Sequence, residues 1–191
     1  NGSNVGCIAG HATNSTIDQC YAEGTSITGV NYVGGICGYA TSSAVISNCY
    51  NLGTVKATNG YAGGILGYGA TATVSYSYST GSVTGTGAAV ANNATTSNIV
   101  SGTAGASDMQ GSKRLSNATG TVAITKPSKF SAWVFSDTGT WTVSNTLNSK
   151  MPILVVFLKN KTFTVNTMVS GSGGTITASS TSGIAYNASN L

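Results

Sequence analysis

The sequence has very few charged side chains. Its 191 residues include 8 Lys and Arg and 4 Asp and Glu, so only 6% are charged, against about 25% in an ordinary soluble domain. Proline is also rare, with 2 residues, while 40% of the residues are hydrophobic. Disordered chains usually combine low hydrophobicity with high net charge, so this composition argues against disorder. The scarcity of Glu, Lys and Arg, which favour helices, argues against a mainly helical protein.

Long apolar runs are missing as well. The longest, at residues 153–158, is strand-sized, whereas a membrane helix needs about 20 apolar residues. Seven of the eight basic residues follow residue 105, and they are scattered. Surfaces that bind nucleic acid normally carry a dense stripe of Lys and Arg with stacking aromatic rings. We therefore expect neither a membrane span nor nucleic-acid binding.

Small polar residues are abundant instead. The chain has 26 Gly, 26 Ser, 28 Thr and 17 Asn, which together make up half of it. Its surface is therefore expected to consist of hydroxyl and amide groups. Threonine, valine, isoleucine and tyrosine favour strands, and glycine and asparagine favour turns. The composition predicts an all-β protein with many turns.

The first half of the chain contains an internal repeat. One block reads VGCIAGH at 5–11, VGGICGY at 33–39 and AGGILGY at 62–68. A second block repeats in the same phase, as IDQCYAEGT at 17–25, ISNCYNLGT at 46–54 and VSYSYSTGS at 74–82. A decayed fourth copy begins at Gly87. Repeated units of this length, each too small to bury its own core, are typical of solenoid proteins.

Short β-rich runs between glycines predict a parallel β-solenoid of about three to four coils. Equivalent residues of successive coils then lie about 4.8 Å apart and form columns. The aliphatic column should line the core. The predicted columns are Tyr21, Tyr50 and Tyr78; Tyr32 and Tyr61; His11, Tyr39 and Tyr68; and Ile8, Ile36, Ile65 and Val90.

These blocks resemble the GLUG-motif repeats of large bacterial surface proteins. The units YVGGICGY at 32–39 and SNCYNLGTV at 47–55 carry the resemblance. Such repeats occur in adhesins and in the non-catalytic parts of IgA-cleaving peptidases. The resemblance therefore implies a repeat region at a bacterial cell surface, with no catalytic role of its own.

Three regions are predicted along the chain. Residues 1–105 form the solenoid, and residues 106–160 form a capping region that resembles the segment closing such arrays. In this region Phe130, Trp133, Phe135 and Trp141 are expected to plug the open end of the stack, which otherwise exposes core and unpaired strand edges. Residues 161–191 form a β tail, and they resemble the start of a small β-repeat module of bacterial surface proteins.

The cysteines offer a candidate disulfide. Cys20 and Cys49 are equivalent positions in neighbouring coils, so their Cα atoms should be within the range that a disulfide allows. The alternative is a ladder of buried thiols, which is favoured because the next coil has Ser77 at this position. Cys7 and Cys37 are out of register by two residues and too far apart to form a disulfide.

Catalytic groups are scarce. His11 is the only histidine, and its column is otherwise tyrosine, so we expect a ring stacked on Tyr39. Asp18 and Glu23 are the only carboxylates of the repeats, and their five-residue separation places them on opposite faces of an extended strand. We therefore predict no catalytic residue, no cofactor and no metal site.

Tyrosines and asparagines supply the remaining candidate sites. If they face solvent, the columns of Tyr21, Tyr50 and Tyr78 and of Tyr32 and Tyr61 form a contact strip for sugar or protein. If they do not, they are aromatic ladders that stabilise the stack. Asn-x-Ser/Thr triplets give candidate glycan acceptors, which need a glycosylating host: Asn14, Asn93, Asn117 and Asn160.

The favoured function is an extracellular, non-enzymatic adhesion or stalk segment at the cell surface. Its partners would be a protein or glycan of a host or neighbouring cell, or copies of the chain itself. Two alternatives remain open. In one, the chain is a filament or surface-layer subunit that assembles by strand addition of residues 161–191. In the other, it is a non-catalytic spacer of a large surface peptidase or glycosidase.

Overall fold

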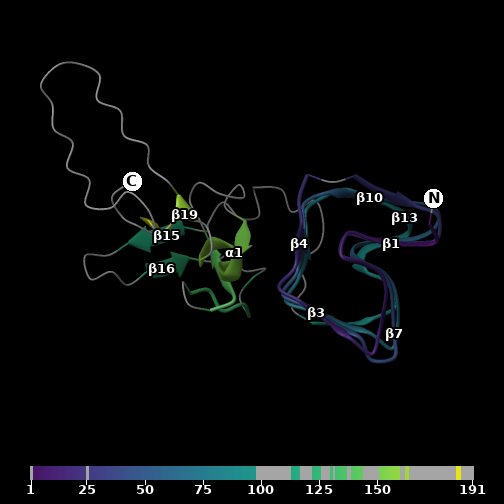
Figure 1. Ribbon diagram of the computed structural model, residues 1–191, viewed down its shortest axis with the longest axis horizontal. Coiled ribbons are helices and arrows are strands. Elements are labelled where there is room, and N and C mark those ends of the chain that lie inside the picture. The colour runs from purple at the N-terminus through teal and green to yellow at the C-terminus, as the bar shows by residue number, and fades with distance from the viewer. Residues whose placement is uncertain are drawn as a thin grey trace, which may run out of the picture.

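The computed structural model describes residues 2–24, 26–97, 113–116, 122–125, 130, 132–136, 139–143, 151–159, 162–163 and 184–185. Within these residues the protein is almost entirely β, and its first part is a parallel β-solenoid of stacked coils, as the repeats predict (Figure 1). None of the described helices is long and apolar enough to cross a membrane. The region boundaries at residues 105 and 160 stay predictions.

The coils follow one another with nearly the same order of short strands. The first contains β1 (Asn4–Gly6), β2 (Ala9–Thr13), β3 (Thr16–Asp18), β4 (Tyr21–Ala22) and β5 (Ser26–Gly29). The second contains β6 (Tyr32–Gly34), β7 (Cys37–Thr41), β8 (Val45–Ser47) and β9 (Tyr50–Asn51). They continue into β10 (Thr54–Ala70), β11 (Thr73–Ser75) and β12 (Tyr78–Ser79), and then into β13 (Val83–Ala91) and β14 (Thr95–Ser97).

The strand register confirms the columns that the repeats predict. His11 pairs with Tyr39, which pairs with Tyr68, and Tyr32 pairs with Tyr61. Tyr21, Tyr50 and Tyr78 are also in register. All these pairs are parallel and belong to the seven-stranded and the three-stranded sheet, and a four-stranded parallel sheet, β14-β11-β8-β3, stacks beside them. Each coil therefore adds one layer to three continuous sheets.

The aliphatic column lines the core, with one exception. Ile36, Ile65 and Val90 are buried, together with Ile46, Val74 and Cys49. Ile8, however, is 48% exposed, so its predicted place in the core is wrong. It belongs to the first coil, where no coil in the described chain lies over its outer side.

Tight turns join the strands through left-handed residues. Gln19, Asn48 and Tyr76 occupy equivalent places after the strands of one sheet, with φ of 51°, 51° and 45°. Asparagine tolerates this conformation better than most residues, whereas an aromatic residue rarely adopts it. The coil geometry is thus imposed at Tyr76 by the stack, even where the local sequence does not favour it.

The second part of the chain is described in pieces. β15 (Lys113–Ser116) pairs with β16 (Val122–Thr125), and β17 (Trp141–Val143) pairs with β18 (Pro152–Leu154), both antiparallel. A five-residue helix, α1 (Val155–Lys159), follows β18. β19 (Thr162–Phe163) pairs with β20 (Ile184–Ala185) of the same chain. Most of residues 161–191 lies outside the described residues, so strand addition by this tail stays a prediction.

The aromatic residues of this second part cover a side of the solenoid. Phe130, Trp133 and Trp141 pack in one buried cluster with Tyr50 and Tyr78 of the second and third coils. Figure 1, which looks along the stack, shows the segment with α1 beside β4. The prediction that these residues plug the open end is therefore wrong. The reason is that the tyrosine column offers a continuous aromatic face on the outside of the three-stranded sheet.

Candidate functional site

The column of Tyr21, Tyr50 and Tyr78 is a structural ladder. Its ring centroids are 5.0 and 5.1 Å apart, with interplanar angles of 15° and 3°. Tyr50 and Tyr78 are buried under the aromatic residues of the second part, and the Tyr78 hydroxyl donates a hydrogen bond to the Pro152 carbonyl at 2.7 Å. Burial also raises the pKa of Tyr50. Of the two alternatives left open for this column, the aromatic ladder fits Tyr50 and Tyr78, because another part of the chain occupies their face.

The second set of aromatic residues lies in a different environment. We call it the outer aromatic cluster, and each of its members contacts at least one other, with ring centroids 4.9 to 6.3 Å apart. Its tyrosines are half-buried and its histidine is exposed. It joins two columns that are separate in the repeats, that of Tyr32 and Tyr61 and that of His11, Tyr39 and Tyr68. Its members are His11, Tyr32, Tyr39, Tyr61 and Tyr68.

Close approach of two backbone segments brings the two columns together. Figure 1 shows that the coil turns inward between β1 and β7. At this turn a Cβ atom on Gly67 would lie 2.6 Å from the backbone nitrogen of Val33, so only glycine fits. Tyr32 at the start of β6 therefore reaches Tyr39 on β7, with ring centroids 5.1 Å apart. The signal in the sequence was a tyrosine on each side of the glycine-rich turn in the second and third coils, at 32 and 39 and at 61 and 68.

The rings of the cluster pack on one another, and hydroxyl groups lie beside them. His11 and Tyr39 stack at 5.0 Å with an interplanar angle of 26°, which confirms the predicted stacking. Tyr32 and Tyr39 also stack, with an interplanar angle of 23°. Hydroxyl groups lie beside them, since the Thr13 hydroxyl oxygen is 3.1 Å from His11 Nε2 and 3.2 Å from the Thr41 hydroxyl oxygen. The arrangement suits neutral polar contacts rather than ion pairs.

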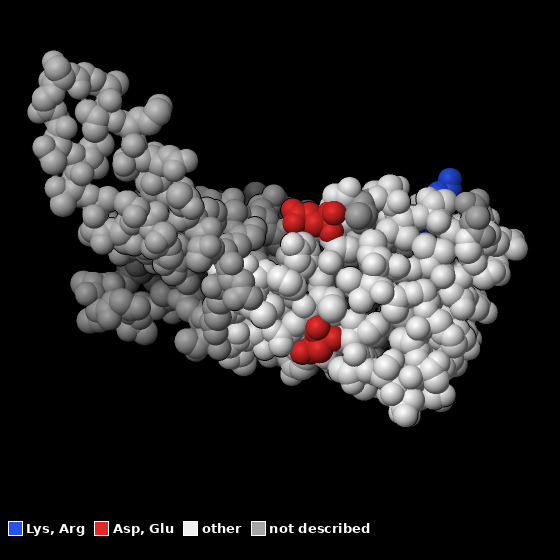
Figure 2. Space-filling view, in the orientation of Figure 1, with Lys and Arg blue, Asp and Glu red and all other residues white. Residues whose placement is uncertain are grey.

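The two carboxylates of the repeats do not form an acid–base pair. Figure 2 shows two separate acidic areas on the described surface. Asp18 accepts hydrogen bonds from the Ser47 hydroxyl at 2.6 Å and from Asn48 Nδ2 at 2.8 Å. Burial by itself would raise the pKa of Asp18. These hydrogen bonds and that from Gln19 outweigh burial, so the pKa of Asp18 lies below its usual range. Asp18 therefore joins the first coil to the second as a charged acceptor.

The structure gives no support to a metal centre in the part of the chain that it describes. There, no group of three or more His, Cys, Asp or Glu side chains is placed to hold an ion.

Residues Asn14 and Asn93, two of the candidate glycan acceptors, are exposed at left-handed turns. Asn93 Nδ2 donates to the Gly69 carbonyl at 2.8 Å. Asn117 and Asn160 lie outside the described residues, and glycosylation stays a prediction at all four sites.

The four cysteines lie in different environments. Cys7 is exposed, whereas Cys37 and Cys49 are buried. Cys37 pairs with Ala9, so Cys7 is two residues out of register with it, as predicted. Cys20 and Cys49 lie side by side in the stack, since Tyr21 pairs with Tyr50. Their oxidation state stays a prediction.

Thiol reactivity should follow this order of burial. Burial raises the pKa of Cys37 to about 11 and that of Cys49 to about 12, and it also raises the pKa of Cys20. A raised pKa leaves less thiolate at pH about 8, so alkylation slows. We expect an alkylating reagent to modify Cys7 faster than the other three, and at least about tenfold faster than Cys37 and Cys49. Peptide mass mapping checks the order, and loss of the two thiol hydrogens in the non-reduced protein would show a Cys20–Cys49 disulfide.

Comparison with known proteins identifies the repeat. Residues 29–56 match the family model of the GLUG motif, which is the stretch from the end of β5 to the start of β10. No curated protein and no solved structure matches the chain. The resemblance drawn from the repeats is therefore confirmed for this stretch: the second coil of the solenoid is a GLUG motif.

Proposed function

We propose that the chain is a non-enzymatic adhesion or stalk segment of an extracellular bacterial surface protein, and that the outer aromatic cluster is its contact surface. The GLUG motif supports this proposal because it suggests a repeat region of a surface protein. The observation that carries the proposal is the cluster itself. Five aromatic rings stay partly exposed on one side of the stack, whereas the other tyrosine column is covered by the chain's own residues.

The chemistry of the cluster favours a neutral partner. Tyrosine offers a large contact area at a low cost in conformational entropy, and its hydroxyl group can donate and accept hydrogen bonds. Threonine hydroxyl groups lie beside the rings. The partner is then a glycan or a protein on the surface of a host or neighbouring cell, held by hydroxyl and aromatic contacts.

Substitution in the centre of the cluster tests the proposal. Tyr32 contacts three other tyrosines, Tyr39, Tyr61 and Tyr68. In a cell-binding assay we expect Tyr32→Ser to weaken binding about tenfold or more, as loss of a central interface tyrosine usually does. Binding should change little between about 0.05 and 0.5 M salt, because screening affects charged contacts most.

A matched control separates this effect from loss of any tyrosine. Tyr76 is exposed too, but its ring contacts Trp133 and is not part of the outer aromatic cluster. The Tyr76→Ser variant should therefore bind as the unchanged chain does. Equal loss in both variants, or a steep decline of binding with salt, would contradict the proposed surface. Circular dichroism of each variant confirms that the coils are retained.

A further inference from the structure

The tyrosine hydroxyl groups of the outer aromatic cluster are not used inside the protein. In the covered tyrosine column, the Tyr78 hydroxyl donates a hydrogen bond to the Pro152 carbonyl at 2.7 Å. In the outer aromatic cluster, by contrast, none of the four tyrosine hydroxyl groups forms a hydrogen bond with another residue that the structure describes. Tyrosine hydroxyl groups away from bulk water usually find a partner. Four groups that can each donate and accept are thus available to a ligand in one place.

These hydroxyl groups repeat along the stack. Tyr32 pairs with Tyr61, and Tyr39 pairs with Tyr68, so the second and third coils present the same two tyrosines at positions about 4.8 Å apart. Tyr61 in turn pairs with Thr86 of β13, which is exposed and adds a further hydroxyl group. A ligand that itself repeats in this direction would meet similar groups in each coil.

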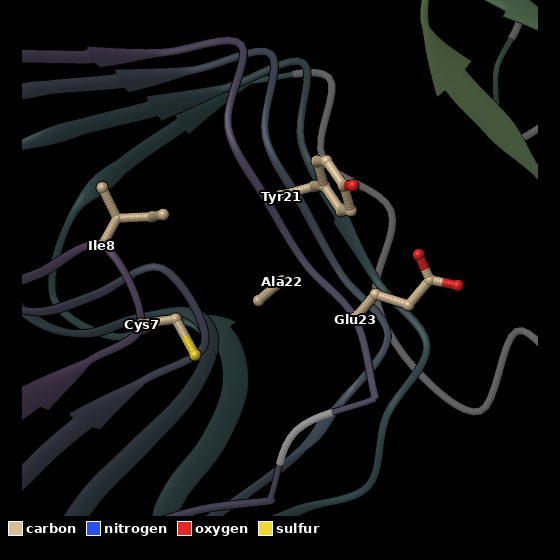
Figure 3. A pocket seen from close by; sticks show the side chains of 5 residues that line it. All are labelled: Cys7, Ile8, Tyr21, Ala22 and Glu23. Carbon is tan, nitrogen blue, oxygen red and sulfur yellow. The ribbon is translucent and has the colours of Figure 1, made fainter. Parts of the chain in front are cut away.

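Charged side chains are scarce on the strands that carry the cluster. β2, β6 and β7 contain no Lys, Arg, Asp or Glu, and β10 contains one lysine, Lys56, near its start. Asp18 ends β3 in another sheet, and Figure 3 shows Glu23 close to Tyr21, which belongs to the other tyrosine column. A polymer with a charge on every unit would lack an opposite charge in each coil, whereas a neutral polymer needs none.

We infer that the outer aromatic cluster binds a neutral, straight, β-linked glycan of the cellulose type, which runs along the stack. This inference rests on the proposed contact surface and names its partner. Successive sugar rings of such a glycan advance by nearly the spacing between coils, so their polar groups meet the tyrosines of successive coils. A folded protein does not present one group again and again at this spacing. The repeat of unused hydroxyl groups therefore favours a glycan over a protein.

Oligosaccharides of increasing length test this inference. The probes are cello-oligosaccharides and chito-oligosaccharides, from the monosaccharide upward, titrated into the full chain by calorimetry. We expect the affinity of at least one series to rise about tenfold or more from the monosaccharide to the trisaccharide, because the added units bind to further coils at a high effective concentration. Malto-oligosaccharides are the matched control. Their α linkage curves the chain away from the stack, so their affinity should not rise with length.

Removal of hydroxyl groups without loss of the rings tests the contact atoms. The double variant Tyr39→Phe and Tyr68→Phe keeps both rings and removes two hydroxyl groups that bond to no other described residue. The affinity for the trisaccharide should fall about tenfold or more, as expected for two lost hydrogen bonds, while the melting temperature stays the same. Tyr76→Phe lies outside the outer aromatic cluster, and it should bind as the unchanged chain does.

Three results would overturn the inference. Neither β-linked series binds, or the affinity does not rise with length more than it does for malto-oligosaccharides, or the double variant binds as tightly as the unchanged chain. The cell-binding assay separates this failure from failure of the proposed function. If cells bind through Tyr32 but the oligosaccharides do not, the contact surface stands and its partner is not this glycan. If neither cells nor oligosaccharides bind, both proposals fail.

Discussion

Replacing Gly34 by alanine is expected to destabilise the coils strongly. A Cβ atom at this position would lie 1.9 Å from the carbonyl oxygen of Cys37 and 2.7 Å from the backbone nitrogen of Gly67. Both are backbone atoms of neighbouring strands, so no side-chain movement relieves the overlap. We expect the free energy of unfolding to fall by at least about 3 kcal/mol, at the upper end of the usual cost of overpacking. Urea denaturation followed by circular dichroism measures it.

A second glycine provides the control for this prediction. Gly2 is exposed, and a Cβ atom there would meet the Val5 Cγ2 atom at 3.2 Å and the Asn4 carbonyl oxygen at 3.9 Å. Gly2→Ala should therefore change stability by no more than about 0.5 kcal/mol. If Gly34→Ala unfolds at the same urea concentration as Gly2→Ala, the close packing of the strands at this turn is not required.

Removal of the Trp141 ring is expected to lower the free energy of unfolding by a similarly large amount. Trp141 is buried in the cluster that covers the tyrosine ladder, 6.1 Å from Tyr50 and 6.0 Å from Tyr78 between ring centroids. Its Nε1 also donates a hydrogen bond to Asn48 Oδ1 at 3.2 Å. Trp141→Ala should lower the free energy of unfolding by about 3 to 5 kcal/mol, as is usual for a buried Trp. Denaturation and limited proteolysis measure the loss.

Two variants show where the effect of Trp141 arises. Trp141→Phe keeps an aromatic ring but removes the donor to Asn48, so it should cost clearly less than Trp141→Ala. Val134 belongs to the same segment but is exposed, and Val134→Ala should be close to neutral. A Trp141→Ala protein with unchanged stability and unchanged protease resistance would contradict the packing of this segment on the side of the solenoid.

The repeats predicted the stacking because a parallel stack translates sequence period directly into contact. Once residues 5–11 align with 33–39 and 62–68, each residue has its partner in the next coil, without knowledge of the rest of the fold. The pairs of His11 with Tyr39 and of Tyr21 with Tyr50 follow from that alignment alone. Ile8 departed from the pattern, because burial needs a neighbour on both sides of the coil and the first coil has one.

The candidate site was harder to predict, since it depends on contacts between columns. The alignment placed Tyr32 and Tyr39 in two columns, and only the inward turn of the coil brings their rings to 5.1 Å. The alignment of the repeats also did not show which tyrosine column the second part of the chain would cover. Tyr78 receives its hydrogen-bond partner from Pro152, and no periodicity links residues so far apart in the sequence.

The sequence alone thus determined the repeat, the parallel register and the near absence of charge from the coils. A charge repeated in every coil would lie about 4.8 Å from its own copy, so hydroxyl and amide groups are the polar groups that stack without repulsion. The tertiary structure decided what remains exposed. It covered one tyrosine column with Trp133 and Trp141 and merged the other with the column of His11 into one cluster. It also left Ile8 uncovered at the end of the stack. These outcomes depend on packing between segments that do not repeat, and packing of that kind leaves no period in the sequence.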